Sequence, residues 1–220
     1  MSDDRSNART ETAKRTDDND IIEAAADDAL AGGGGLAGGN RQREIGSRDD
    51  MRRATRIDII AGYFTPSPTM LRRLDRAGRR TDRVRIVTAA KSDNNATIAA
   101  ARFTYAGLLR KGVHVFEYQP TKLHTKLYVI DDAVHIGSAN FDMRSLFINM
   151  ELMIRIEDPG FAAHVRRYVD AEIAASTEIT PALYKAKTGW LQRVKQFGAY
   201  FVVAVVDPNV SRGLNFGIED

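Results

Sequence analysis

The strongest constraint on the fold is a regular alternation of short β-branched runs with helix-like segments between Ile57 and Glu117. Ile57–Gly62, Val84–Ala89 and Val113–Glu117 each have the composition of a strand. Between them, Thr69–Arg80 and Thr97–Arg110 repeat apolar residues at helical spacing. A strand–helix–strand–helix–strand order is typical of right-handed crossovers between parallel strands.

The second half of this region adds strands that follow each other closely. Lys126–Ile130 and Ala133–Gly137 predict a hairpin about Asp131 and Asp132, and Glu151–Ile156 predicts one more strand. Further helices are predicted at Phe161–Ser176 and within Pro181–Lys195. We therefore expect an α/β fold with a mixed, largely parallel sheet and helices on both faces.

Charge and composition divide the chain into three regions. Residues 1–50 hold 12 acidic and 7 basic side chains and include a glycine-rich stretch, which predicts an acidic, disordered tail or linker. Residues 51–180 contain all the predicted strands and form the expected catalytic domain. Residues 181–220 form a basic and apolar C-terminal segment.

The C-terminal segment includes ten consecutive uncharged residues, Phe197–Val206. This run is too short to span a bilayer. One interpretation buries it in the core as a strand or helix. The other places it in the head-group region of a membrane, with nearby aromatic residues at the interface and Lys185, Lys187, Arg193 and Lys195 on anionic lipid.

Composition limits the chemistry that the chain can carry. It has no cysteine and four histidines, so thiol nucleophiles, disulfides and iron–sulfur clusters are excluded and a histidine-based metal cluster is poorly supplied. The net charge is +3, and the body after residue 50 is the basic part. A basic body suits an anionic partner, either nucleic acid or phospholipid head groups, although a mild excess of arginine also occurs without such a role.

The residues that carry chemistry lie between Leu123 and Met153. On a strand from Leu123 to Ile130, His124, Lys126 and Tyr128 would share one face because side chains alternate. After the hairpin, Gly137-Ser138-Ala139-Asn140 puts a hydroxyl and an amide at a sharp turn, with a glycine that allows close approach. A nitrogen nucleophile, a cation and two polar groups are suited to binding and attacking a phosphate.

This pattern resembles the HKD motif of the phospholipase D superfamily: His124-x-Lys126, Asp131, then Gly137-Ser138-x-Asn140. The connection from Asp131 to Gly137 is one residue shorter than is usual. The following residues, together with segments around Tyr63, Ala90 and Gly112, are similar to the C-terminal half of bacterial cardiolipin synthases. The likeness covers residues 57 to about 157 and implies a phospholipase D-like half-domain.

The resemblance also implies roles for individual residues. His124 is expected to be the nucleophile or the acid, with Lys126, Asn140 and Ser138 on the phosphoryl oxygens and Glu151 orienting the histidine. Asp131 and Gly137 are expected to shape the motif; Asp131 would brace the hairpin. Tyr128 is expected to pack rather than react. Lys91, Asp93 and Arg144 are candidates for substrate contact, although Arg144 would equally serve to cap a helix.

The motif implies a phosphohistidine intermediate that forms without metal or other cofactor. Related enzymes pair two motifs, and this chain has one, because none of His114, His135 and His164 is followed two positions later by lysine. A second motif is therefore expected from a partner chain, as in a homodimer.

We expect a cardiolipin synthase-like phosphatidyltransferase or phosphodiesterase. It would act on an anionic, phosphatidylglycerol-like phospholipid, as a peripheral protein at the cytoplasmic face of the membrane. The alternatives are a homodimeric nuclease of the same superfamily, for which nucleic acid is the less expected partner, and a truncated, inactive half-enzyme.

Overall fold

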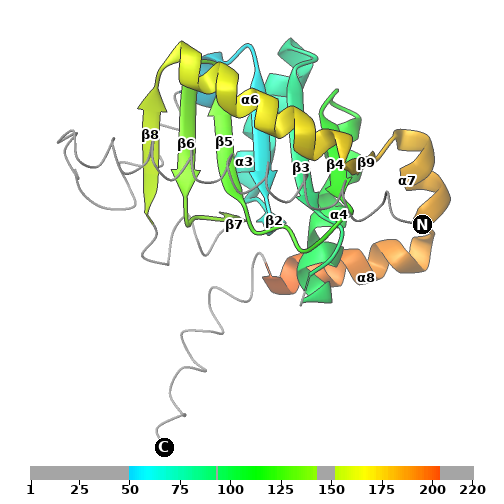
Figure 1. Cartoon of the computed structure of the whole chain (residues 1–220). Coiled ribbons are helices and arrows are strands. Elements are labelled where there is room, and N and C mark those ends of the chain that lie inside the picture. Colours follow the sequence, from blue (N-terminus) through cyan, green and yellow to red (C-terminus); the bar gives the residue numbers. More distant parts are fainter. Residues whose placement is uncertain (1–49, 93, 143–151, 204–220) are drawn as a thin grey trace, which may run out of the picture. The chain divides into compact units, whose positions relative to one another are not determined.

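A mixed sheet forms the centre of the computed structural model, which describes residues 50–92, 94–142 and 152–203 (Figure 1). All of these residues belong to Gly38–Asp220, the second of two compact units into which the chain divides. The first unit, Met1–Ala37, lies outside the described residues, as does the predicted tail up to residue 49.

The sheet has seven strands in the order β8-β6-β5-β1-β3-β4-β9. The strands are β1 (Ile57–Ala61), β3 (Val84–Ala89), β4 (His114–Tyr118), β5 (Lys126–Ile130), β6 (Ala133–Gly137), β8 (Met153–Glu157) and β9 (Ser176–Glu178). A separate pair of short strands, β2 (Phe64–Thr65) and β7 (Phe141–Asp142), runs parallel. Neither β2, β7 nor β9 was expected from the sequence.

Strand directions decide which residues meet at each end of the sheet. β1, β3 and β4 pair in parallel, whereas β5, β6, β8 and β9 each pair antiparallel with their neighbours. The predicted mixed α/β sheet is confirmed. It is not largely parallel, because only two pairs of adjacent strands in it, β1–β3 and β3–β4, are parallel. The reason is local: a tight connection such as that between β5 and β6 joins antiparallel strands only.

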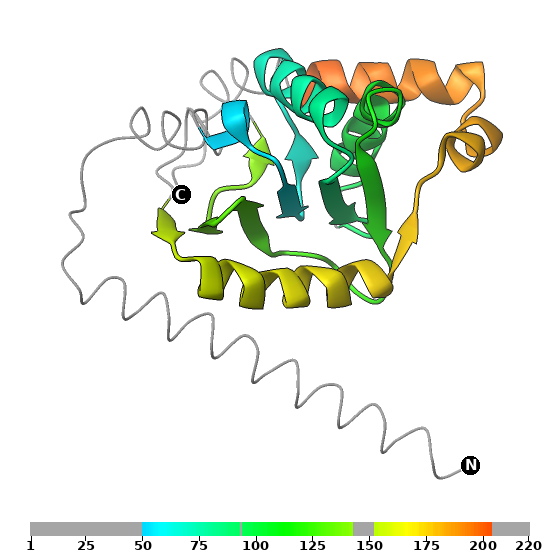
Figure 2. The same cartoon turned by 90° about the horizontal axis from the view of Figure 1, so that it is seen from above.

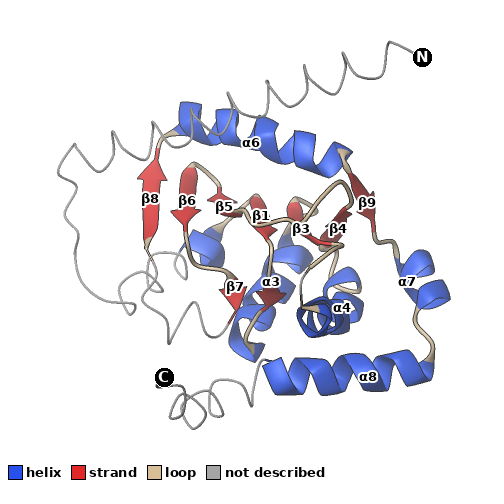
Figure 3. Cartoon of the chain, turned by 60° about the horizontal axis from the view of Figure 1, so that its bottom comes forward, coloured by secondary structure: helices blue, strands red, loops and turns tan. Residues whose placement is uncertain are grey.

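Helices cover both faces of the sheet, as predicted (Figure 2). α6 lies on one face, and α3 and α4 lie on the other, with α8 outside α4 (Figure 3). The helices are α3 (Pro68–Arg80), α4 (Asn95–Leu109), α6 (Pro159–Ala174), α7 (Pro181–Lys187) and α8 (Trp190–Phe201).

Side-chain caps explain why two helices begin earlier than their apolar spacing predicts. The Asn94 side chain accepts a hydrogen bond from the N–H of Ala96, and Asp158 accepts one from the N–H of Phe161. Each cap satisfies a first-turn N–H group that has no partner within the helix. α4 therefore starts at Asn95 and α6 at Pro159, two residues before the predicted starts.

Strand alternation produces two apolar layers. Tyr128 and Ile130 of β5 face α3 and α4, where they join the larger cluster around Leu74 and Leu108. Leu127 and Val129 face α6 and pack with its inner face, including Val165. The sheet is thus apolar on both faces, as expected for strands covered by helices on either side.

Candidate active site

The motif residues gather at one edge of the sheet because of the strand directions. β1, β3 and β6 end at this edge and β5 begins there, which is the lower edge in Figure 1. The register Leu127↔Ile136 between β5 and β6 puts Gly137 level with Lys126. The start of the motif and its GSxN turn are therefore on adjacent strands. Sites in open α/β sheets commonly lie at the carboxyl ends of parallel strands.

His124 lies just before β5 rather than within it. The strand expected from Leu123 is thus three residues too long at its start, and the face shared by alternation applies to Lys126 and Tyr128, not to His124. The His124 side chain is exposed. Gly62 packs against its backbone: a Cβ on Gly62 would lie 2.3 Å from the Leu123 carbonyl oxygen, so no larger residue fits.

Lys126 is almost entirely buried, with 8% of its surface exposed. Its Nζ donates a hydrogen bond of 2.6 Å to the carbonyl oxygen of His124. Because burying an unpaired ammonium is costly, this contact helps to hold the cation at the edge of the sheet. The backbone of the exposed His124 is therefore tied to a buried positive charge.

The GSxN turn is attached to the segment that enters β8. The N–H of Ser138 donates to the Leu152 carbonyl oxygen at 2.9 Å, and the N–H of Leu152 donates to the Ser138 Oγ at 3.0 Å. Gly137 lies against the same backbone, because a Cβ there would be 1.9 Å from the Leu152 oxygen. The turn requires glycine for this close approach.

Asn140 has hydrogen-bonding capacity that the described residues do not use. Its Oδ1 is buried and has no hydrogen-bond partner among them. Buried polar atoms are nearly always paired, so this oxygen, just after the GSxN turn, is available to accept a hydrogen bond from a bound group.

Tyr128 supports the same turn from below. Its hydroxyl donates to the Ala139 carbonyl oxygen at 2.6 Å, and its ring meets Phe141 edge-on. Phe141 in turn stacks on Phe64 where β2 pairs with β7. Tyr128 therefore packs in the core, as expected, and it also links β5 to the GSxN turn. The sequence did not indicate this link.

Asp131 lies at the other end of β5, in the hairpin turn and away from His124. Its carboxylate accepts hydrogen bonds from the N–H groups of Thr55 and Arg56 and from the Thr55 hydroxyl. Arg166 of α6 donates to its carbonyl oxygen. The residue has a positive φ of 46°, which the turn requires. These contacts brace the hairpin against the start of β1.

The remaining predicted site residues are Lys91, Asp93, Arg144 and Glu151. Lys91 is exposed after β3, with its Nζ 3.5 Å from the Pro120 carbonyl oxygen, and β1 separates β3 from β5. Asp93, Arg144 and Glu151 lie outside the described residues.

A charge cluster under α6 was not anticipated. Asp58 in β1 is fully buried and contacts three arginines: Arg85 at 2.5 Å, Arg56 at 3.2 Å and Arg166 at 3.2 Å. In the sequence, Asp58 stands out only as a single carboxylate within the β-branched run Ile57–Gly62. Its partners come from distant parts of the chain, so spacing could not identify them.

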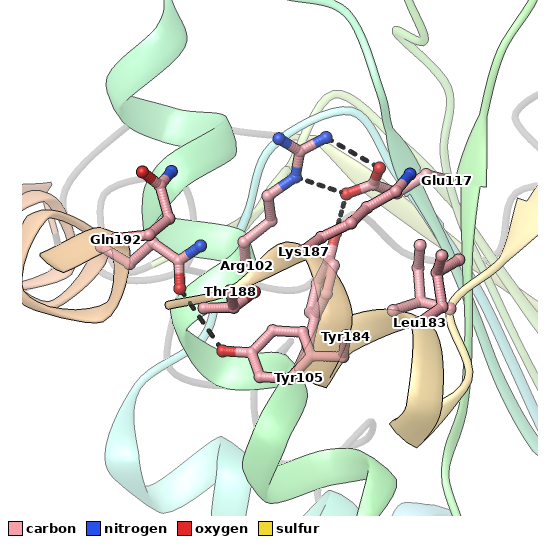
Figure 4. Close-up of a pocket in the computed structure, with 10 residues that line it drawn as sticks. Arg102, Tyr105, Glu117, Leu183, Tyr184, Lys187, Thr188 and Gln192 are labelled. Atoms are coloured by element: carbon pink, nitrogen blue, oxygen red, sulfur yellow. Dashed lines mark hydrogen bonds and ion pairs between the residues drawn. The ribbon is translucent and has the colours of Figure 1, made fainter. Parts of the chain in front are cut away.

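A second polar cluster lines a pocket of about 140 Å³ between α4, β4, α7 and α8 (Figure 4). Arg102 forms two hydrogen bonds with Glu117, of 2.7 and 2.8 Å, and the Tyr105 hydroxyl donates to Glu117 at 3.3 Å. Burial, with the nearby Glu117 charge, raises the pKa of Tyr105 well above its usual range, so this hydroxyl stays protonated. The pocket is lined by none of the motif residues.

No group of three or more histidine, aspartate or glutamate side chains suited to a metal ion occurs among the described residues.

Comparison with known proteins identifies the family of the chain. The family model described as "Cardiolipin synthase, PLD-like domain" matches residues 49–173, more than half of the chain. The chain therefore belongs to the phospholipase D superfamily, in the branch of the cardiolipin synthase domains.

Curated relatives point to the same branch. Cardiolipin synthase A of Pseudomonas aeruginosa is 35% identical over 144 residues, which cover 65% of this chain and 29% of the relative. Cardiolipin synthase A of Escherichia coli O157:H7 is 34% identical over 140 residues, 63% of this chain and 29% of the relative. The chain thus spans less than a third of the length of these relatives.

Solved structures share the fold. Nuc from Salmonella typhimurium, a phospholipase D family member, aligns with a TM-score of 0.54 at 22% identity, covering 62% of this chain and 90% of Nuc. NucT from Helicobacter pylori gives 0.52 at 18%, covering 64% and 92%. Phosphatidylserine synthase of Haemophilus influenzae gives 0.50 at 14%, covering 83% and 44%.

Proposed function

We propose that this chain is a cardiolipin synthase-like phosphatidyltransferase or phosphodiesterase that uses His124 as its nucleophile and requires a second motif from a partner chain. The observation that carries the proposal is the position of His124. His124 is exposed just before β5, the Lys126 Nζ of that strand donates to its carbonyl oxygen, and β5 pairs with β6, the strand that leads to Asn140. The similarity to cardiolipin synthases supports a phospholipid substrate.

In the proposed first step, a nitrogen of His124 attacks the phosphorus of the phospholipid. A P–N bond forms, and the bond from phosphorus to the leaving alcohol breaks. The histidine of the second motif, protonated at this stage, gives its proton to the leaving oxygen.

In the second step, an acceptor alcohol or water attacks the phosphohistidine. The acceptor's proton goes to the second histidine, the new P–O bond forms and the P–N bond breaks, which restores both imidazoles. The Lys126 ammonium and the Asn140 and Ser138 side chains would stabilise the negative charge that builds up on the phosphoryl oxygens. Glu151 would orient the histidine. No metal is required for these steps.

The second motif would come from a second copy of this chain or from another motif-bearing chain, since this sequence holds one. Phosphatidylglycerol is the proposed phosphatidyl donor, because its phosphodiester is anionic and the body of the protein is basic. The same charge argument favours the anionic cytoplasmic leaflet as the working surface.

The direct test is to incubate the protein with phosphatidylglycerol micelles and follow cardiolipin, glycerol and phosphatidic acid by mass spectrometry. We expect His124→Ala to abolish product and His114→Ala to leave it unchanged. His114 is the matched control, because it is exposed at the start of β4, on the edge opposite the motif. An acid-labile phosphate adduct on His124 should accumulate with a slow acceptor, and full activity after chelation is expected.

Light scattering decides where the second motif comes from. A mass near twice 24.4 kDa, with activity, supports a homodimer. A strict monomer that becomes active only when another motif-bearing chain is added supports a mixed pair. A monomer without activity under any of these conditions would contradict the proposal and favour the inactive half-enzyme.

A nuclease is the second candidate, because this fold aligns with 90% of the chain of Nuc, whose whole length corresponds to one unit of this kind. Cleavage of single-stranded DNA with no change in phosphatidylglycerol would favour this function over phosphatidyl transfer.

A further inference from the structure

Helix α8 is oriented with its apolar face toward solvent. Trp190 is 74% exposed, Val194 60% and Phe197 53%, and Leu191, Phe201 and Val202 are also exposed. At 100° per residue these side chains fall on one continuous side of the helix. A surface helix of a globular protein normally has the opposite arrangement, with its apolar stripe toward the core.

Contacts on the inner side keep the helix in this orientation. Gln196 and Tyr200 are its buried residues. The Tyr184 hydroxyl of α7 donates to the Gln196 side-chain oxygen at 3.4 Å, and the Tyr200 hydroxyl donates to the Pro66 carbonyl oxygen at 2.9 Å. The Phe103 ring of α4 lies 5.1 Å from that of Tyr200. Turning α8 to bury its apolar side would break these contacts.

The charge around α7 and α8 has one sign. No acidic residue occurs between Glu178 and Asp207, whereas Lys185, Lys187, Arg193 and Lys195 do. On the helical wheel Arg193 and Lys195 lie on opposite flanks of the apolar side. Arg193 is held over the Tyr184 ring, 6.0 Å from its centre. Basic side chains on both sides of an apolar, aromatic stripe are typical of helices that lie in the interface of anionic membranes.

A groove of about 520 Å³ adjoins this surface, between α4, α7 and α8. Its apolar wall includes Ala106, Leu109 and Trp190, and three cations, Arg110, Lys185 and Arg193, line it. Apolar surface next to convergent positive charge is complementary to the glycerol backbone and phosphate of a lipid.

The C-terminal end of α8 lies near the motif edge. Pro66, which holds Tyr200, directly follows β2, and β2 pairs with β7 beyond the GSxN turn. Figure 3 shows α8 on the side of α4 away from the sheet, running from α7 toward the side of the molecule where β7 lies. No helix among the described residues is long and apolar enough to cross a bilayer.

We propose that α8 is a membrane-docking helix: its apolar side inserts into the interface of an anionic bilayer, and the groove beside it holds the phosphate of a lipid head group. The site is separate from His124 and Lys126. It would bring the motif edge to the surface of the membrane that contains the substrate, and it names the partner surface for the proposed function.

Trp190 is the single tryptophan of the chain and reports directly on this surface. Vesicles of phosphatidylcholine with 30% phosphatidylglycerol should shift its emission to the blue and carry the full chain upward in flotation. Lipids brominated on the acyl chains should quench it. Pure phosphatidylcholine vesicles should bind far more weakly, and added salt should reduce binding to the anionic vesicles.

Two variants separate the apolar and charged contributions. Leu191→Ser with Val194→Ser should abolish flotation, since both side chains are exposed and their loss leaves the inner contacts intact. Lys185→Gln with Arg193→Gln should weaken binding roughly thirtyfold. Arg76→Gln with Arg79→Gln, an equal charge loss on the exposed side of α3, is the matched control and should bind almost as wild type.

Several results would overturn the docking site. An unchanged Trp190 emission with anionic vesicles would do so, as would equal binding to neutral and anionic vesicles. A blue shift that depends on protein concentration without lipid, together with a doubled mass, would assign the surface to a second copy of the chain instead.

Failure of docking and failure of the proposed activity can be distinguished. His124→Ala should float like wild type. The Leu191→Ser/Val194→Ser variant should keep its turnover of soluble bis(p-nitrophenyl) phosphate and lose turnover on vesicles. Turnover in micelles without vesicle binding would contradict the docking site alone, and vesicle binding without turnover would contradict the catalytic proposal alone.

Discussion

The Nζ of Lys126 donates a hydrogen bond of 2.6 Å to the main-chain carbonyl oxygen of His124, two residues earlier. The motif lysine therefore fixes the backbone from which the motif histidine projects. Because Lys126 is itself held in β5 opposite Ala61 of β1, the position of His124 depends on the sheet and not only on its own loop.

Replacing Lys126 with methionine should retain the fold and remove activity. Methionine keeps most of the buried length but has neither the charge nor the hydrogen bond to His124. We expect kcat/KM for phosphatidyl transfer to fall by about 10²–10³, the usual effect of losing one group that stabilises transition-state charge. Circular dichroism and urea unfolding check the fold. Activity within threefold of wild type would show that Lys126 has only a structural role.

Gly137→Ala should destabilise the protein through one backbone contact. The new Cβ would lie 1.9 Å from the Leu152 carbonyl oxygen, so β6 and β8 must separate. We expect a loss of roughly 1–3 kcal/mol in the free energy of unfolding, as for other overpacked positions. Gly107→Ala in α4 is the control, because nothing lies within 4 Å of its Cβ, and it should be neutral or stabilising. Equal effects of the two would contradict the close approach at Gly137.

Asp58→Asn should be strongly destabilising. Asp58 is 0% exposed and is the shared partner of Arg85, Arg56 and Arg166, so the substitution removes the buried carboxylate from three partly buried guanidinium groups. Loss of one partner of a buried pair costs about 3–5 kcal/mol. Asp170 is a second partner of Arg85, and the Asp170 side chain is 55% exposed. Asp170→Asn should therefore cost less than about 1 kcal/mol. Chemical denaturation of the two variants compares them directly.

His135 should make the protein less stable in mild acid. Burial lowers the pKa of this histidine, the nearby Asp50 raises it in part, and Arg155 lowers it further. The folded state therefore binds a proton less readily than the unfolded chain, whose histidine titrates near pH 6.5. Stability should fall as the pH drops below about 6.5, until the folded-state pKa is passed.

The His135 effect is measured by urea unfolding at pH 7.5 and pH 5.5. His135→Gln should reduce the loss of stability between these two values. His114→Gln, at an exposed position, should leave the loss as in wild type. A His135→Gln protein with the wild-type pH dependence would assign the acid sensitivity to other groups.

Local patterns were sufficient to predict most of the sheet. β3 and β6 have the predicted bounds, and β1 ends one residue early. β5 has the bounds predicted for the hairpin, not those of the longer strand expected from Leu123. These strands are short β-branched runs with turn residues on both sides, so their identity depends on neighbours within a few positions. β2, β7 and β9 could not be predicted, because strands of two or three residues exist only where a partner pairs with them.

The motif residues were identifiable from the sequence, but their supports were not. His124, Lys126, Ser138 and Asn140 stand out by residue type and spacing. By contrast, Tyr128 reaches Ala139 and Gly62 fits against Leu123 only because β5 lies between β1 and β6.

The sequence by itself determined the family, the motif and the alternation of strands and helices, because these depend on residue types and on backbone periodicity over short distances. Tertiary structure decided which residues share the motif edge, because strand order and direction bring the start of β5 beside the end of β6. It also decided the orientation of α8. Residues 197–203 are apolar by composition alone. Among the described residues, contacts with Tyr184, Pro66 and Phe103 turn Gln196 and Tyr200 inward and leave the apolar side of the helix exposed.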